Sequence, residues 1–150
     1  MSVRICVLFI VLILLVSGCG EDDAVWENVA GDEFASVEQF MNDYITSWET
    51  SLQTQNFSIM EPYFIINSHV YHMQRRQHQQ LVGARQREEI VQTEEHTLQT
   101  NQYNQLRWIW TEVVNVHQHV EKLEEVRSRT FSISRSNESY KITAIEHQSE

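Results

Sequence analysis

An amphipathic helix near the start of the chain is the feature that most constrains the fold. Large apolar residues recur at helical spacing between residues 37 and 52: Val37, Phe40, Met41, Tyr44, Ile45, Trp48 and Leu52. Such a stripe predicts a helix that packs one face on a core. Ser36 and Gln39 have the spacing of a capping box, which satisfies free amides in the first helical turn. We therefore expect the helix to begin at Ser36.

Two shorter helices are expected between residues 56 and 83. Asn56 is a candidate N-cap for the first, and Pro62 limits how far a regular helix can continue. Ser68 is a candidate N-cap for the second. Gly83 stands where a left-handed residue often ends a helix, so this helix is predicted to stop there.

Strand-like alternation replaces helical spacing after Gly83. Between residues 106 and 117, five of the six even positions are apolar, and all six are expected to face the core: Leu106, Trp108, Trp110, Glu112, Val114 and Val116. This segment is therefore the best-defined strand in the sequence.

Three further strands are predicted over residues 90–98, 121–134 and 139–147. The change of parity between Ile142 and Ile145 predicts a bulge in the last of them. The expected fold class is α+β, with three N-terminal helices packed on a curved antiparallel sheet of about four strands.

The first residues have the plan of a secretory signal peptide. Arg4 precedes an uninterrupted apolar run from Ile5 to Val16. That run is shorter than the roughly 17–25 residues that cross a bilayer as a helix, which favours a cleaved signal over a permanent anchor.

The sequence Val16-Ser17-Gly18-Cys19 resembles a bacterial lipobox, whose cysteine is linked to diacylglycerol before cleavage ahead of it. We expect a signal peptide over 1–18, a flexible tether over 19–33 and a domain over 34–150. Lipid on Cys19 would hold the protein on the extracytoplasmic face of the cell membrane. The alternative is an ordinary signal peptide with an incidental cysteine. Cys6, the other cysteine, lies in the part removed, so no internal disulfide is expected.

The charge balance argues against a nucleic-acid partner. The chain has 11 Lys and Arg against 21 Asp and Glu, a net charge of −10. Phosphate-backbone binding needs clustered basic side chains in excess. We therefore expect no nucleic-acid partner, whereas lipid on Cys19 would make the membrane a partner.

The order of elements, with the stretches "NFSIMEPYF" and "YKITAIEH", resembles the nuclear transport factor 2-like cone domain. The resemblance covers roughly residues 34–147 and is closest to the extracellular domain of TcaA-type envelope proteins. It implies a non-enzymatic accessory domain at the cell envelope, with an envelope polymer or protein as its candidate partner. Those proteins carry a cytoplasmic zinc ribbon and a transmembrane helix where this chain has the lipobox. The wider superfamily also contains isomerases and dehydratases that work inside the cone.

An enzyme hypothesis depends on Glu112, the one carboxylate on the apolar even face of its strand. A carboxyl group in an apolar cone would have a raised pKa suited to proton transfer. Alternatively, a bulge near Thr111 turns it to solvent, or Arg107, Arg127 or Arg129 pairs with it.

A candidate ligand pocket combines Glu112 with four aromatic residues, which could equally be core: Tyr44, Trp48, Trp108 and Trp110.

A metal site is the third hypothesis. His117 and His119 would share one face of a strand, and His69 and His72 could meet on a helix. Neither pair has a recognisable third ligand, so we expect no metal and no cofactor. The sequence favours a lipid-anchored, non-catalytic binding protein, with a small-molecule enzyme or a metal-binding lipoprotein as alternatives.

Overall fold

The computed structural model describes residues 24–118, 121–136 and 139–148, so the predicted signal peptide and Cys19 lie outside the described residues. Its elements follow one another along the chain: β1 (Trp26–Asn28), α2 (Asp32–Thr54), η1 (Phe57–Tyr63), α3 (His69–Gly83), β2 (Gln86–Asn101), β3 (Leu106–Gln118), β4 (Glu121–Ser136) and β5 (Ser139–Gln148). The five strands form one antiparallel sheet in the order β1-β2-β3-β4-β5.

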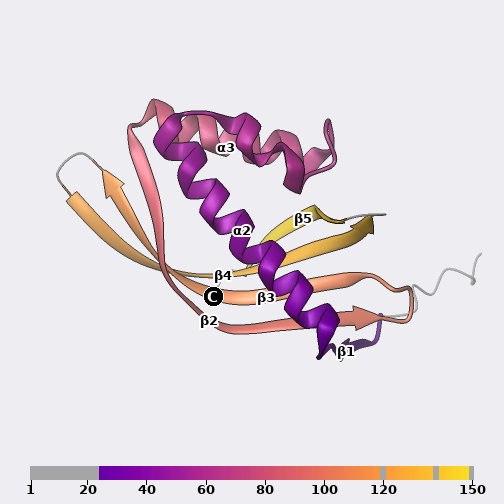
Figure 1. Ribbon diagram of the computed structural model, residues 1–150. Helices are drawn as coiled ribbons and strands as arrows, with labels where there is room; N and C mark the ends of the chain where they lie inside the picture. The colour runs from indigo at the N-terminus through magenta and orange to yellow at the C-terminus, as the bar shows by residue number, and fades with distance from the viewer. Residues whose placement is uncertain (1–23, 119–120, 137–138, 149–150) are drawn as a thin grey trace, which may run out of the picture.

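All three helices lie on one face of this sheet, which bends around α2 (Figure 1). The α+β class and the three helices of the prediction are confirmed, and the sheet has one strand more than the four expected. The extra strand is β1. Only three residues long, it gives no alternation that a sequence pattern could reveal.

Strand β1 corrects the expected tether. Trp26 pairs with Asn101 of β2, and the Arg107 guanidinium lies 4.1 Å from the centre of the Trp26 ring. Residues 26–28 are therefore part of the sheet, and α2 begins at Asp32, within the predicted tether 19–33.

Helix α2 begins one turn earlier than predicted, so the proposed capping box is wrong. Gly31, with φ 78°, is the N-cap residue and makes no side-chain cap. Ser36 instead donates to the Asp32 carbonyl at 2.8 Å, and Gln39 donates to Asp43 at 2.8 Å. The left-handed backbone at Gly31 favours glycine, which starts the helix without a capping side chain.

The other two helix starts are confirmed. Asn56 Oδ1 accepts from the Ser58 amide at 3.1 Å, and Ser68 Oγ accepts from the Tyr71 amide at 3.3 Å. Helix α3 ends at Gly83 as predicted, but the left-handed conformation predicted there is wrong: the C-cap Ala84 has right-handed geometry, and Arg85 takes the positive φ of 54°. The reversal into β2 thus falls two residues later.

The inward face of β3 is as predicted. All six even positions are buried: Leu106, Trp108, Trp110, Glu112, Val114 and Val116. The bulge in β5 is also present, since Phe131 pairs with Ile145 while Ile133 pairs with Ile142. It returns both isoleucines to the core side of the sheet.

The core fills the space between α2 and the concave face of the sheet. Trp108 and Trp110 meet edge to face with ring centres 6.2 Å apart, and Trp110 lies 5.4 Å from Phe131. Tyr44 of α2 packs edge to face on Phe131 at 5.8 Å. Aromatic contacts of this kind hold the long helix across the sheet.

Candidate functional site

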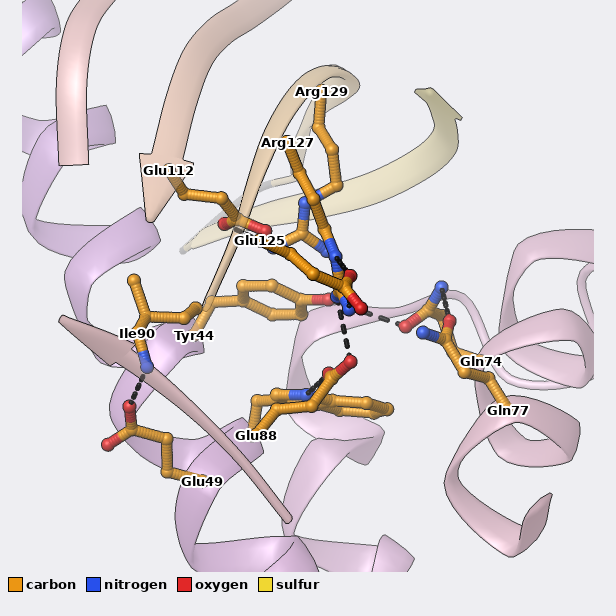
Figure 2. Close-up of polar contacts among 11 residues, drawn as sticks. Tyr44, Glu49, Gln74, Gln77, Glu88, Ile90, Glu112, Glu125, Arg127 and Arg129 are labelled. Atoms are coloured by element: carbon orange, nitrogen blue, oxygen red, sulfur yellow. Dashed lines mark hydrogen bonds and ion pairs between the residues drawn. The ribbon is translucent and has the colours of Figure 1, made fainter. Parts of the chain in front are cut away.

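The five residues of the predicted pocket are all buried, at 0–4% exposure: Tyr44, Trp48, Trp108, Trp110 and Glu112. They divide into two groups. Trp108 and Trp110 pack in the aromatic core. Tyr44, Trp48 and Glu112 lie in or beside a charged cluster under the C-terminal half of α2, which we call the buried cluster and which consists of Glu88, Glu112, Arg127 and Arg129. Polar contacts of the cluster are drawn in Figure 2.

Glu112 pairs with Arg129 inside the fold. Arg129 Nη2 lies 2.5 Å from Glu112 Oε2, and the two side chains are 8% and 0% exposed. Glu112 is therefore paired with an arginine and does not turn toward solvent, which were two of the alternatives for this residue. A buried carboxylate held by a guanidinium is a charged, hydrogen-bonded group whose partner is fixed.

Tyr44 covers this ion pair, and its hydroxyl points toward the arginines and toward Gln74, to which it donates at 3.5 Å (Figure 2). Burial raises the pKa of Tyr44 to about 12, with Arg129 opposing the rise and Glu112 adding to it. The hydroxyl therefore keeps its proton at physiological pH.

A second buried ion pair joins β4 to the start of β2. Arg127 Nη1 donates to Glu88 Oε1 at 2.7 Å, and Trp48 Nε1 donates to Glu88 Oε2 at 3.1 Å. Arg127 also contacts Glu125 at 2.7 Å. Burial alone would lower the pKa of Arg127, but the charges of Glu88 and Glu125 outweigh it and raise that pKa. Both oxygens of Glu88 are thus occupied.

Some buried polar atoms have no protein partner among the described residues: Trp108 Nε1, Trp110 Nε1, Glu112 Oε1 and Arg129 Nε. An unsatisfied group of this kind costs about 1–3 kcal/mol unless water reaches it. Two of these atoms belong to the Glu112–Arg129 pair, so that pair carries a desolvation cost as well as an attraction.

A cavity of about 590 Å³ lies beside the cluster. Its walls come from α2, from the α3–β2 turn, from β2 and from β3: Glu49, Gln53, Arg85, Arg87, Glu88, Glu89 and His117. Only Glu88 belongs to both the cavity wall and the buried cluster. None of the five predicted pocket residues is in this wall, so the hollow lies elsewhere than the sequence pattern suggested.

The carboxylates of the cavity are engaged by the protein itself. Glu49 accepts from the Ile90 amide at 2.7 Å, beside a register shift in β2. Glu89 lies 3.1 Å from His117, and this hydrogen bond lowers the pKa of Glu89. The same contact occupies Nε2 of His117, one of the histidines of the metal hypothesis.

The other histidines of the metal hypothesis are not part of the cavity wall or of the buried cluster as described. His69 and His72 are exposed on α3, and His119 lies outside the described residues. Within residues 24–118, 121–136 and 139–148, no three His, Cys, Asp or Glu side chains gather as metal ligands.

Sequence reasoning missed Glu88 and the cavity. The first long strand was expected from Ile90, but β2 begins at Gln86 and Glu88 faces the same side as Ile90. The alternation of Glu88 with Ile90 was a usable signal for this longer strand. The cavity gave no such signal, because its residues come from four segments of the chain.

A bent antiparallel sheet whose concave face is covered by a long helix and two shorter ones defines an NTF2-like cone domain. The family described as the TcaA protein NTF2-like domain matches residues 34–146, and the chain belongs to this family. The match spans α2 to β5 and so includes both the buried cluster and the cavity.

One relative aligns with nearly the whole chain. It is an uncharacterized protein of Alkalihalophilus pseudofirmus, 26% identical over 146 residues, which are 97% of this chain and 95% of the relative. No solved structure matches the chain. Among the described residues, no helix is both long and apolar enough to cross a membrane.

Proposed function

We propose that this protein is a lipid-tethered accessory protein of the cell envelope that binds an envelope component through its NTF2-like domain and catalyses no reaction. The observation that carries the proposal is the state of the cone interior. Trp108 and Trp110 fill it, and the charge of Glu112 is held by Arg129 at 2.5 Å.

Glu112 lacks what a catalytic carboxylate needs. A general acid or base must come within hydrogen-bond reach of a substrate. Glu112 is completely buried and is absent from the wall of the 590 Å³ cavity. Its one side-chain partner is a guanidinium, which does not exchange protons at physiological pH. These facts favour a structural role for the pair.

The envelope location is supported by the N-terminal sequence and by the family. The apolar run from Ile5 to Val16 and the lipobox ending at Cys19 support export and lipid attachment. Membership of the TcaA-type family supports an envelope-associated protein. Residue 24, where the described structure begins, is only five positions beyond Cys19, so the domain would sit close to the membrane.

Two measurements test the proposal. Mass spectrometry of the protein from membrane fractions should show an N-terminal diacylglyceryl cysteine at residue 19; an intact Met1 or a free thiol on Cys19 would overturn the anchor. Photo-cross-linking on intact cells, with the cross-linker at Gln53 in the cavity wall, should capture an envelope component. Cross-linking from Thr143 on the exposed side of β5 is the matched control.

A further inference from the structure

The basic residues of this acidic protein are unevenly distributed. Residues 62–87 contain four arginines and no Asp or Glu, which leaves seven Lys and Arg against all 21 Asp and Glu in the rest of the chain. This segment forms α3 and the turn into β2. A strongly acidic molecule thus carries one region of opposite sign.

The fold places these arginines on the outside. Helix α3 turns one face to the core, with four residues buried: Val70, Tyr71, Gln74 and His78. Arg75 and Arg76 lie on its other side, and Arg85 and Arg87 follow the helix; all four side chains are exposed. We call these four residues the α3 basic surface.

The arginines of this surface differ from those of the sheet. Arg127, Arg129 and Arg135 each form an ion pair with a glutamate. Arg107 donates to Gln99 and stacks on Trp26. Among the described residues, no carboxylate lies within 4.0 Å of an arginine of the α3 basic surface. Their donors are available to another molecule.

The cavity extends this surface inward, because Arg85 and Arg87 line it. Its three glutamates are already bonded: Glu88 to Arg127 and Trp48, Glu89 to His117, and Glu49 to the Ile90 amide. The wall thus contains both signs of charge, and Arg85 and Arg87 are its charged side chains without a hydrogen-bond or ion-pair partner among the described residues. A guanidinium binds carboxylate and phosphate groups through paired N–H donors, so the ligand chemistry is anionic.

The position of the surface decides between a membrane and a polymer. The Val25 amide donates to Gln102, which fixes the N-terminal end of the domain beside the β2–β3 turn. Arg85 and Arg87 lie at the opposite end of β2, whose 16 residues span about 50 Å when extended. Figure 1 shows β1 at one end of the sheet and the junction of α3 with β2 at the other. A chain anchored by its N-terminus presents this surface away from its own membrane.

We propose that the α3 basic surface and the adjoining cavity bind a polyanionic polymer of the cell envelope, one that carries repeated phosphate or carboxylate groups. This inference rests on the proposed function and names the chemical class of its ligand. Arg75 and Arg76 contact successive anionic groups along the polymer, and Arg85 and Arg87 hold one group at the mouth of the cavity.

The test uses the full-length protein held by its N-terminus in phosphatidylcholine vesicles. The probes are linear polyphosphate, poly-L-glutamate and uncharged dextran. Binding of at least one polyanion, weakening as salt is added, and no binding of dextran are expected. Replacing all four arginines by glutamine should lower the affinity at least tenfold. The single change Arg87→Gln should lower it roughly two- to fivefold, as expected for one exposed charge contact.

Arg135→Gln is the matched control, because Arg135 is an exposed cation at the other end of β4, beside the β2–β3 turn and away from the cavity. It should leave the affinity unchanged, and an equal loss in Arg135→Gln and Arg87→Gln would overturn the proposal. If the fourfold variant does not fold, Arg87→Gln and the pair Arg75→Gln/Arg76→Gln decide the outcome.

A membrane ligand would give a different result. If vesicles containing phosphatidylglycerol abolish polyphosphate binding by the attached protein, the surface lies on the bilayer and the proposal is wrong. If no polyanion binds while photo-cross-linking from Gln53 still captures an envelope component, the polyanion inference fails and the proposed function stands.

Discussion

The two ends of the concave face are built in opposite ways. Under the N-terminal half of α2 the interior is aromatic, with Phe34 5.4 Å from Trp108 and His96 stacked on the same indole. Under the C-terminal half it contains two ion pairs, Glu112–Arg129 and Glu88–Arg127. Trp108 and Glu112 are both almost completely buried, whereas His96 and Arg127 at the edges of the two ends are partly exposed.

The two ends are therefore expected to contribute differently to the free energy of unfolding. Burying an aromatic side chain stabilises the fold directly, whereas a buried ion pair loses much of its attraction to desolvation. The aromatic end is therefore expected to contribute most of the free energy of unfolding. The charged end links β4 to β2 and β3 through its ion pairs, and Glu88 forms part of the cavity wall.

The largest expected effect comes from the aromatic end. Trp110→Ala should lower the free energy of unfolding by about 3–5 kcal/mol, because the indole is 1% exposed and packs on Trp108 and Phe131. Denaturant melts of the two proteins measure the loss. Arg107→Ala, on the outer face of the same strand, should cost under about 1 kcal/mol, and the reverse ranking would contradict the assigned facing of β3.

Breaking the Glu112–Arg129 ion pair should also lower the free energy of unfolding by about 3–5 kcal/mol, because a buried group loses its partner. Arg129→Met leaves the Glu112 carboxyl group in the core without its partner. The double variant Glu112→Leu/Arg129→Met removes both charges and should unfold within about 1 kcal/mol of the natural protein, or be more stable. If the double variant is as unstable as the single one, the pair itself is a main source of stability and the contrast between the two ends fails.

The two ends should also differ in what an indole N–H contributes. Trp48 Nε1 donates to Glu88, whereas Trp108 Nε1 has no partner among the described residues. Trp48→Phe should therefore cost about 1.5 kcal/mol more than Trp108→Phe, the size of a hydrogen bond to a charged group. Equal losses in thermal melts would mean that the Trp48–Glu88 bond adds nothing.

The smallest effect concerns pH. Burial, followed by the charges of Arg129 and Arg127, lowers the pKa of the partly exposed His147 below its ordinary value of 6.5. The unfolded chain then binds more protons below pH 6.5, so stability should fall as pH decreases through that value. In His147→Gln, the loss of unfolding free energy over this pH range should be smaller than in the natural protein, by under about 0.5 kcal/mol. His69→Gln, on the exposed side of α3, should leave it unchanged.

Elements with a strong period of their own could be predicted from the sequence. The stripe from Val37 to Leu52 became α2, and the even positions from Leu106 to Val116 became the inner face of β3. In both cases one side of a single element faces the core, and the spacing of apolar residues within that element is enough to predict which side it is. Three-residue β1 depends instead on its pairing with β2, and the start of α2 at Asp32 depends on the backbone angle of Gly31 before it.

The partner of Glu112 could not be predicted from the sequence. Arg107, Arg127 and Arg129 were all candidates. Arg107 lies on the other face of β3, and Arg127 is directly opposite Glu112 in the strand register, yet Arg129 makes the pair. Arg127 instead reaches Glu88, two strands away. That choice depends on side-chain reach across β2, β3 and β4, which no single strand reveals.

The short β1 strand also determines how the domain responds to a pull on its N-terminus. Three residue pairs attach it to β2, together with hydrogen bonds from Val25 to Gln102 and from Val29 to Leu98. A mechanical load on the N-terminus strains these few bonds before it reaches α2, whose packing is far more extensive. Detaching residues 25–31 lengthens the link by roughly 20 Å, at about 3.4 Å per extended residue. Under such a load, β1 is therefore expected to detach first while α2 keeps its place on the sheet.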